Sequence, residues 1–103
     1  MKEDVVKETM RLLNELSNQL NDVIDLAFGW EVDEDSISGV IDDDYTVDIY
    51  AKNNGNNIVL EYENKEYTDV NTLIKDVIKD VKAYTQSVID EYGEYPNYLN
   101  NIK

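Results

Sequence analysis

Carboxylates are the side chains of this chain that could do chemistry, and they concentrate between residues 31 and 48. This segment, EVDEDSISGVIDDDYTVD, contains eight acids and no Lys or Arg: Glu31, Asp33, Glu34, Asp35, Asp42, Asp43, Asp44 and Asp48. A pair of carboxylates can serve as general acid and base, as in glycoside hydrolysis. Any strongly acidic surface supplies such pairs, so acids alone are a poor catalytic signature. We expect no catalytic residues and no enzymatic activity.

The chain has no Cys and no His. Without Cys it cannot form a disulfide framework, a thiolate zinc site or a thiol nucleophile. Without His it lacks the commonest general base and the commonest transition-metal ligand. The sequence also has no Gly-rich phosphate loop and no nucleophile elbow. These absences predict a protein that works without a cofactor.

A calcium loop is the metal site that the acidic segment most resembles, with Asp33, Asp35 and Gly39 in the expected region. If Asp33 were the first ligand, Ser38 would occupy the position that requires glycine. Asp44 would occupy the position that requires a bidentate glutamate. We therefore expect no dedicated metal site, and only adventitious binding of divalent ions at residues 42–44.

The overall charge restricts the kinds of partner. The 103 residues include 23 acids and nine bases, for a net charge of -14, and no base falls between Leu12 and Ala51. A field of one sign destabilises a compact chain, so it indicates selection for solubility or for a partner of opposite sign. Direct binding to DNA or RNA is disfavoured, because affinity for phosphates comes mainly from cations. Anionic membrane surfaces should also repel the chain.

The first element expected to position these acids is a helix over residues 3–27, ending before Gly29. Its apolar residues recur at three- and four-residue steps. Its opposite side is a narrow polar stripe with a single base: Asp4, Glu8, Arg11, Glu15, Asn18, Asp22 and Asp25. The second half of this helix should therefore be acidic on its outer side.

An antiparallel meander of three to five strands should follow. The candidate strands are residues 30–35, 36–41, 45–51, 58–63 and a short edge strand at 66–67. In the third, Tyr45, Val47, Ile49 and Ala51 alternate with Thr46, Asp48 and Tyr50, which is typical of a strand with one buried face. Residues 53–57, with Gly55 at the centre, predict a hairpin loop.

A second helix is expected from a cap at Thr68 or Asp69 to Tyr92, ending at Gly93. Its polar side divides into a basic edge (Lys75, Lys79 and Lys82) and an acidic edge (Asp69, Asp76 and Asp80). Helix, meander and helix predict one α+β domain over residues 1–103. The economical architecture is a two-layer sandwich with the apolar faces of both helices on one face of the sheet.

The candidate partner-binding surface is a continuous acidic face formed by the first helix and the early strands. Carboxylates there would recur every ~6.7 Å along a strand and every ~6 Å along a helix, on the scale of a phosphate backbone. The alternative is a solvated surface kept for solubility. The candidate binding residues are Glu15, Asp22, Asp25, Glu31, Asp33, Glu34, Asp35, Asp42, Asp43, Asp44, Asp48 and Tyr50.

Tyrosine is a favoured anchor in interfaces. Tyr50, Tyr95 and Tyr98 are open to that role. Tyr62, Tyr67, Tyr84 and Tyr92 are instead expected at the edge of the core with their hydroxyls at the surface.

The chain resembles a class of small acidic proteins from phages and mobile elements. The shared features are its size, its lack of Cys, its acid runs at 31–35 and 42–44 and its order of elements. These proteins disable host defence nucleases; they include DNA mimics and, in particular, anti-CRISPR proteins against type II CRISPR nucleases. The resemblance is one of size, composition and element order, and no motif residues carry over. It implies an inhibitor that blocks either the arginines reading the short duplex motif or the positive channel of the nuclease.

The expected partner is thus a basic nucleic-acid-binding protein, a host defence nuclease. Two alternatives stay open: an immunity protein for a basic nuclease toxin, and a structural or regulatory domain whose acidity serves solubility. The polar N-terminus has no apolar signal region, so we expect a cytoplasmic protein, in the host cytoplasm if it is phage-encoded. The sequence leaves the oligomeric state open.

Overall fold

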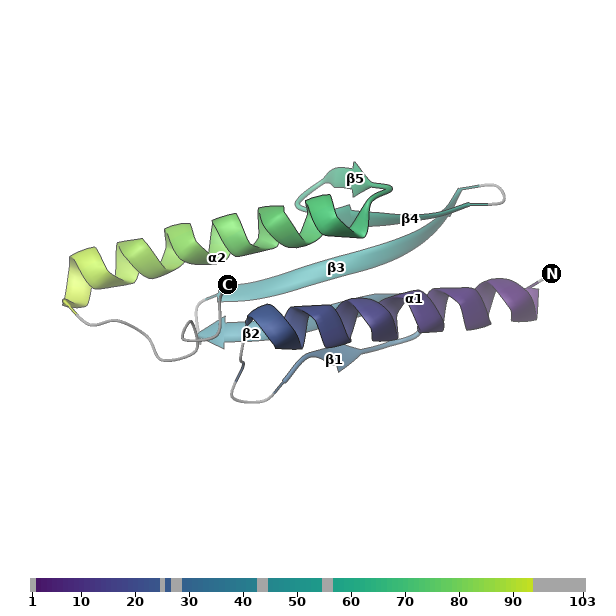
Figure 1. The fold of residues 1–103 in the computed structure, drawn as a ribbon, viewed down its shortest axis with the longest axis horizontal. Coiled ribbons are helices and arrows are strands. Elements are labelled where there is room, and N and C mark those ends of the chain that lie inside the picture. Colours follow the sequence, from purple (N-terminus) through teal and green to yellow (C-terminus); the bar gives the residue numbers. More distant parts are fainter. Residues whose placement is uncertain (1, 25, 27–28, 43–44, 55–56, 94–103) are drawn as a thin grey trace.

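The computed structural model describes residues 2–24, 26, 29–42, 45–54 and 57–93. Five strands form one antiparallel sheet in sequence order, and one long helix stands at each end of the chain (Figure 1). The helices are α1 (Lys2–Val23) and α2 (Val70–Tyr92). The strands are β1 (Glu31–Val32), β2 (Ser36–Asp42), β3 (Tyr45–Asn54), β4 (Asn57–Tyr62) and β5 (Lys65–Tyr67). The expected α+β fold is confirmed.

Both helices cover the same face of the sheet and run in the same direction (Figure 1). Their apolar stripes meet the inward residues of the central strands in a single core. Leu13, Leu16, Leu20, Ile37, Ile49, Leu73, Val77 and Val81 have no solvent exposure. Among the described residues, no helix lies over the opposite face of the sheet. The two-layer sandwich expected from the sequence is therefore the observed arrangement.

The alternation expected in the third strand is confirmed. Val47 and Ile49 are buried, whereas Asp48 and Tyr50 are exposed on the other face. The strand extends beyond Ala51 to Asn54, where it pairs with Asn57 across the hairpin. The central residues of that hairpin loop, including Gly55, lie outside the described residues.

Several boundaries differ from expectation. Helix α1 ends at Val23 rather than at residue 27, and Gly29 follows in a left-handed conformation (φ 71°). The apolar period continues through Ile24 and Leu26 because both side chains are buried in the core, although the backbone there is no longer helical. Only Glu31 and Val32 of the expected first strand pair, because residues 33–35 turn back toward β2.

One close approach fixes the path from α1 into the sheet. A Cβ atom at Gly39 would stand 2.6 Å from both the Trp30 ring and Cδ1 of Leu26. Trp30 is itself buried, at 8% exposure. The indole of Trp30 therefore lies directly on the β2 backbone, where only glycine leaves room for it.

Helix α2 has well-defined ends. Asp69, rather than Thr68, is its N-cap: its carboxylate accepts from the backbone N–H of Asn71 (3.2 Å) and from the Thr72 hydroxyl (2.7 Å). These donors, the Thr72 hydroxyl first, lower the pKa of Asp69 below its ordinary value. Gly93 ends the helix in a left-handed conformation (φ 76°), as expected, and its N–H donates to the carbonyl of Ile89.

Neither helix in the described part of the chain combines the length and the apolar composition that crossing a bilayer would require.

Candidate functional site

The face of the sheet that neither helix covers is built by the strand register. Alternate residues point to it from all five strands, and we call this surface the open face. Its members are Glu31 on β1; Ser36, Ser38 and Val40 on β2; Thr46, Asp48, Tyr50 and Lys52 on β3; Val59 and Glu61 on β4; and Glu66 on β5.

Two rows of polar residues cross the open face. In the first, Glu31 pairs with Ser38, and Ser38 pairs with Asp48. Since strands stand ~4.8 Å apart, the Glu31 and Asp48 backbones are separated by roughly 10 Å. Serine is the only residue between these two exposed acids, so no cation separates them.

In the second row, Tyr50 pairs with Ser36 on one side and with Glu61 on the other. Glu61 in turn pairs with Glu66 at the edge strand. Tyr50 is 48% exposed although it stands on the central strand. An aromatic ring at the centre of a polar, uncovered surface is the arrangement found at interface hot spots, which are enriched in Tyr and ringed by polar residues.

One base stands on this surface. Lys52 donates to Oε2 of Glu61 at 2.6 Å, and this hydrogen bond raises the pKa of the lysine above its ordinary value. The pair compensates one carboxylate. Glu31, Asp48 and Glu66 are exposed and form no salt bridge with a described residue, although the charge of Glu66 also contributes to the raised pKa of Lys52.

The β1–β2 turn extends the acidic surface at one end of the sheet. Asp33, Glu34 and Asp35 are all exposed. The Asp33 N–H donates to the carbonyl of Ser36, and the Ala51 N–H donates to the carbonyl of Asp35, both at 2.8 Å. These backbone bonds hold the turn against β3 and leave its three carboxylates to solvent.

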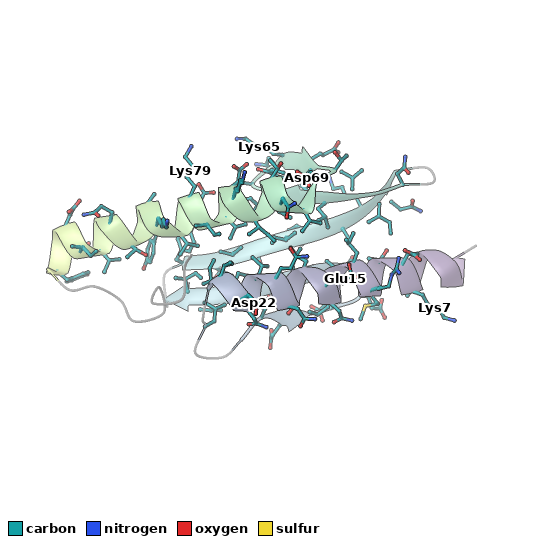
Figure 2. The ribbon with its side chains drawn as sticks, viewed as in Figure 1. Lys7, Glu15, Asp22, Lys65, Asp69 and Lys79 are labelled. Carbon is teal, nitrogen blue, oxygen red and sulfur yellow. The ribbon has the colours of Figure 1, made fainter. Side chains whose placement is uncertain are left out.

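Helix α1 does not continue this surface, so the expected continuous face is wrong. Glu15 and Asp22 lie on α1, in the helical layer (Figure 2). Asp22 lines a groove with Lys75 of α2, and Glu15 lies beside Arg11 and Ile58. The apolar face of α1 packs on the inner side of the sheet, so its polar stripe cannot reach the open face.

The remaining expected residues are less fully placed. Asp42 ends β2, where it pairs with Tyr45 after a register shift. Asp25, Asp43 and Asp44 lie outside the described residues, as do Tyr95 and Tyr98. The structure thus brings Glu31, Asp48 and Tyr50 together on the open face, with residues 33–35 at its end.

Sequence reasoning missed Glu61 and Glu66. The alternation of residues on β4 and β5 places both acids on the same face of the sheet. Whether that face is the open face depends on the pairing of Tyr50 with Glu61, and this register is set by the hairpin loop. With that register known, the two acids follow from the sequence.

The acidic edge of α2 has a structural role instead of a solvated one. The Tyr62 hydroxyl donates to Oδ2 of Asp80, and the Tyr67 hydroxyl donates to Oδ2 of Asp76, both at 2.6 Å. Burial, followed by the bond to Asp80, raises the pKa of Tyr62. The bond to Asp76 raises the pKa of Tyr67 to about 12. These bonds attach α2 to the sheet.

The other tyrosines expected at the core edge differ from one another. Tyr84 is half-buried against Tyr45, with ring centroids 4.5 Å apart. Tyr92 is 69% exposed, so that expectation is wrong. Its position is explained by the length of α2, whose last turns extend past the end of the sheet (Figure 1).

Within the described ranges, no three acidic side chains converge in a way that could hold a metal ion. The exposed carboxylates of the open face can accept hydrogen bonds from Arg and Lys side chains of a partner, and the ring of Tyr50 can pack against the same surface.

Comparison with known proteins adds no relative: no protein-family model, no curated protein and no solved structure matches the chain.

Proposed function

We propose that the protein is a non-catalytic inhibitor whose open face occupies the basic nucleic-acid-binding surface of another protein. The partner implied by the resemblance to small acidic inhibitors is a host defence nuclease of the type II CRISPR class. The observation that carries the proposal is the open face: a sheet face that neither helix covers, with carboxylates outside any salt bridge on β1, β3 and β5 and an exposed Tyr50 on the central strand.

The physical basis is substitution of carboxylates for phosphates. A surface that binds nucleic acid presents Arg and Lys along a path where phosphates carry a charge every few ångströms. Glu31, Asp48 and Glu66 offer three anionic acceptors on a rigid sheet, and the net charge of -14 adds a long-range attraction. Electrostatic complementarity of this kind raises the association rate. A protein bound to that basic surface competes directly with the nucleic acid for it.

Inhibition of DNA cleavage tests the proposal. The protein is titrated into a type II CRISPR nuclease loaded with its guide RNA, and cleavage of a target duplex is measured at low and high salt. We expect inhibition at near-stoichiometric amounts, and weaker inhibition at high salt because the attraction is screened. Isothermal titration with the same complex reports whether the target duplex competes with the protein.

A charge-matched pair of variants locates the surface. Glu31→Gln/Asp48→Asn/Glu66→Gln removes three carboxylates of the open face and should weaken inhibition by about tenfold or more. Glu15→Gln/Asp22→Asn/Glu91→Gln makes the same chemical changes at exposed positions outside that face, and should inhibit like the unmodified protein.

Three results would contradict the proposal. Absence of both inhibition and binding at low salt removes the type II nuclease as partner. Equal loss in the two variants removes the open face as the site. Inhibition of a basic nuclease toxin, without inhibition of the CRISPR nuclease, identifies an immunity protein instead.

A further inference from the structure

A second surface of the protein, away from the open face, has the chemistry of a receptor for a cationic side chain. A shallow surface depression of about 590 Å³, which we call the cavity, lies between the start of β3, the β4–β5 turn and the middle of α2. Its lining residues are Tyr45, Glu63, Asp80, Ala83 and Tyr84. The cavity is open to solvent on one side.

The walls of the cavity are aromatic. Tyr45 points to the helical side of the sheet, and Tyr84 comes from α2 to meet it at 4.5 Å between ring centroids, with an angle of 31° between the planes. Both rings are half-buried. The face of an aromatic ring attracts a cation within ~6 Å of its centroid.

The rim of the cavity is anionic. Glu63 is exposed in the β4–β5 turn and has no hydrogen-bond or salt-bridge partner among the described residues. Asp80 accepts the Tyr62 hydroxyl with Oδ2, so its other oxygen is available to a ligand. No Lys or Arg lines the cavity, and Lys79 projects outward from α2 (Figure 2).

One ring of this packed tyrosine pair, with two carboxylates beside it, matches a guanidinium group. Guanidinium is planar and weakly hydrated, so it stacks on an aromatic ring and donates to carboxylates at the same time. An ammonium group is compact and strongly hydrated, and gains less from the ring.

We propose that this cavity binds an arginine side chain of the partner protein. The identity of the partner rests on the proposed function, but binding of the arginine side chain does not. In the complex, the cavity holds one arginine while the open face meets other basic groups. The protein therefore recognises its partner on two sides, and the second contact distinguishes arginine from lysine.

Three short peptides test the cavity without the partner. Blocked Gly-Arg-Gly, Gly-Lys-Gly and Gly-citrulline-Gly are titrated into the labelled protein, and backbone amide shifts are followed by NMR. Citrulline has the shape of arginine without its charge. We expect saturable shifts centred on Tyr45, Ala83 and Tyr84 with the arginine peptide, binding several-fold weaker with lysine, and at least about tenfold weaker with citrulline.

Matched variants separate a binding site from a structural cluster. Glu63→Gln removes one rim charge without touching the Tyr62 hydrogen bond, and should weaken the arginine peptide several-fold. Glu91→Gln makes the same change on the exposed end of α2 and should leave binding unchanged. Tyr84→Leu should reduce the preference for arginine over lysine, with the amide spectrum reporting whether the fold is kept.

The proposal is overturned if the citrulline peptide binds as well as the arginine peptide, if the shifts centre on the open face, or if Glu63→Gln and Glu91→Gln behave alike. The outcomes for the two proposals are distinguishable. If the protein inhibits the nuclease but shows no arginine-selective shifts at the cavity, the proposed function stands and the arginine site is rejected. If it shows those shifts but does not inhibit the nuclease, the arginine site stands and the proposed partner is rejected.

Discussion

Tyr67 donates its hydroxyl hydrogen to Asp76 across the interface between β5 and α2, at 2.6 Å. Ionisation of this tyrosine would break the bond and place a phenolate against a carboxylate. The neutral form is therefore favoured in the folded protein, and the pKa rises from its ordinary 10.0 to about 12. The stability of the contact between α2 and the sheet therefore depends on whether the Tyr67 hydroxyl is protonated.

The sign of this coupling gives a prediction. The folded pKa of Tyr67 lies above the unfolded value, so its stabilising contribution is complete below pH 10 and is lost as the pH rises through about 12. Tyr67→Phe should lower the free energy of unfolding at neutral pH by about 1 kcal/mol, the usual value of one hydrogen bond. Urea unfolding at neutral and alkaline pH measures both effects.

Tyr50→Phe is the matched control, because this exposed tyrosine donates no hydrogen bond to a described residue. It should unfold like the unmodified protein at neutral pH. If Tyr67→Phe has the stability and the alkaline profile of the unmodified protein, the bond to Asp76 contributes nothing to the fold.

The role of these acids was not evident from the sequence for a physical reason. Asp76 and Asp80 are four residues apart on the polar side of a helical pattern, where carboxylates are ordinarily solvated. The available signal was on the strands: Tyr62 and Tyr67 are buried, and a buried phenol hydroxyl requires a partner. Pairing the two sets requires the position of α2 over β4 and β5, which is a tertiary property.

At the level of elements, the contact between Trp30 and Gly39 joins the end of the α1 connection to β2. Gly39→Ala would place a methyl group 2.6 Å from the indole ring and from Leu26, so the core must shift to accept it. We expect a loss of about 1–3 kcal/mol in the free energy of unfolding, the usual cost of overpacking. Thermal and urea unfolding measure it.

Ser38→Ala controls for the change in strand propensity, because Ser38 is the neighbouring residue on the opposite face of β2. It should cost far less. Trp30→Leu should in turn reduce the cost of Gly39→Ala, because it removes part of the clash. Additive effects of the two changes would show that the ring and the glycine are energetically independent.

The elements themselves were largely predictable, and the exceptions have local causes. The third strand alternated clearly because one face is buried and the other is open. The extent of α1 was overestimated because Ile24 and Leu26 continue the apolar period after the helix has ended. The candidate partner-binding acids were expected on one continuous face because sequence spacing does not say which residues of each strand face the helices.

At the level of the whole molecule, the net charge of -14 should make the fold sensitive to ionic strength. Self-repulsion favours the expanded chain, and salt shortens its range to ~8 Å at physiological ionic strength. The free energy of unfolding should therefore rise as NaCl is added from very low concentration to about 0.15 M. Urea unfolding at a series of salt concentrations measures the increase.

MgCl₂ at the same ionic strength is the control for specific ion binding. Equal stabilisation by the two salts is the result expected from screening alone. A much larger effect of the divalent salt would indicate specific cation binding, and a stability independent of NaCl would show that self-repulsion is negligible.

The parallel course of α1 and α2 has an electrical consequence. Each helix dipole places about half a negative elementary charge at its C-terminal end, and neither helix has a basic residue in its last turn to offset it. Both ends point toward the side of the molecule where β3 begins (Figure 1). The field of a positively charged molecule nearby would therefore tend to turn the helix C-terminal ends toward that molecule before any contact forms.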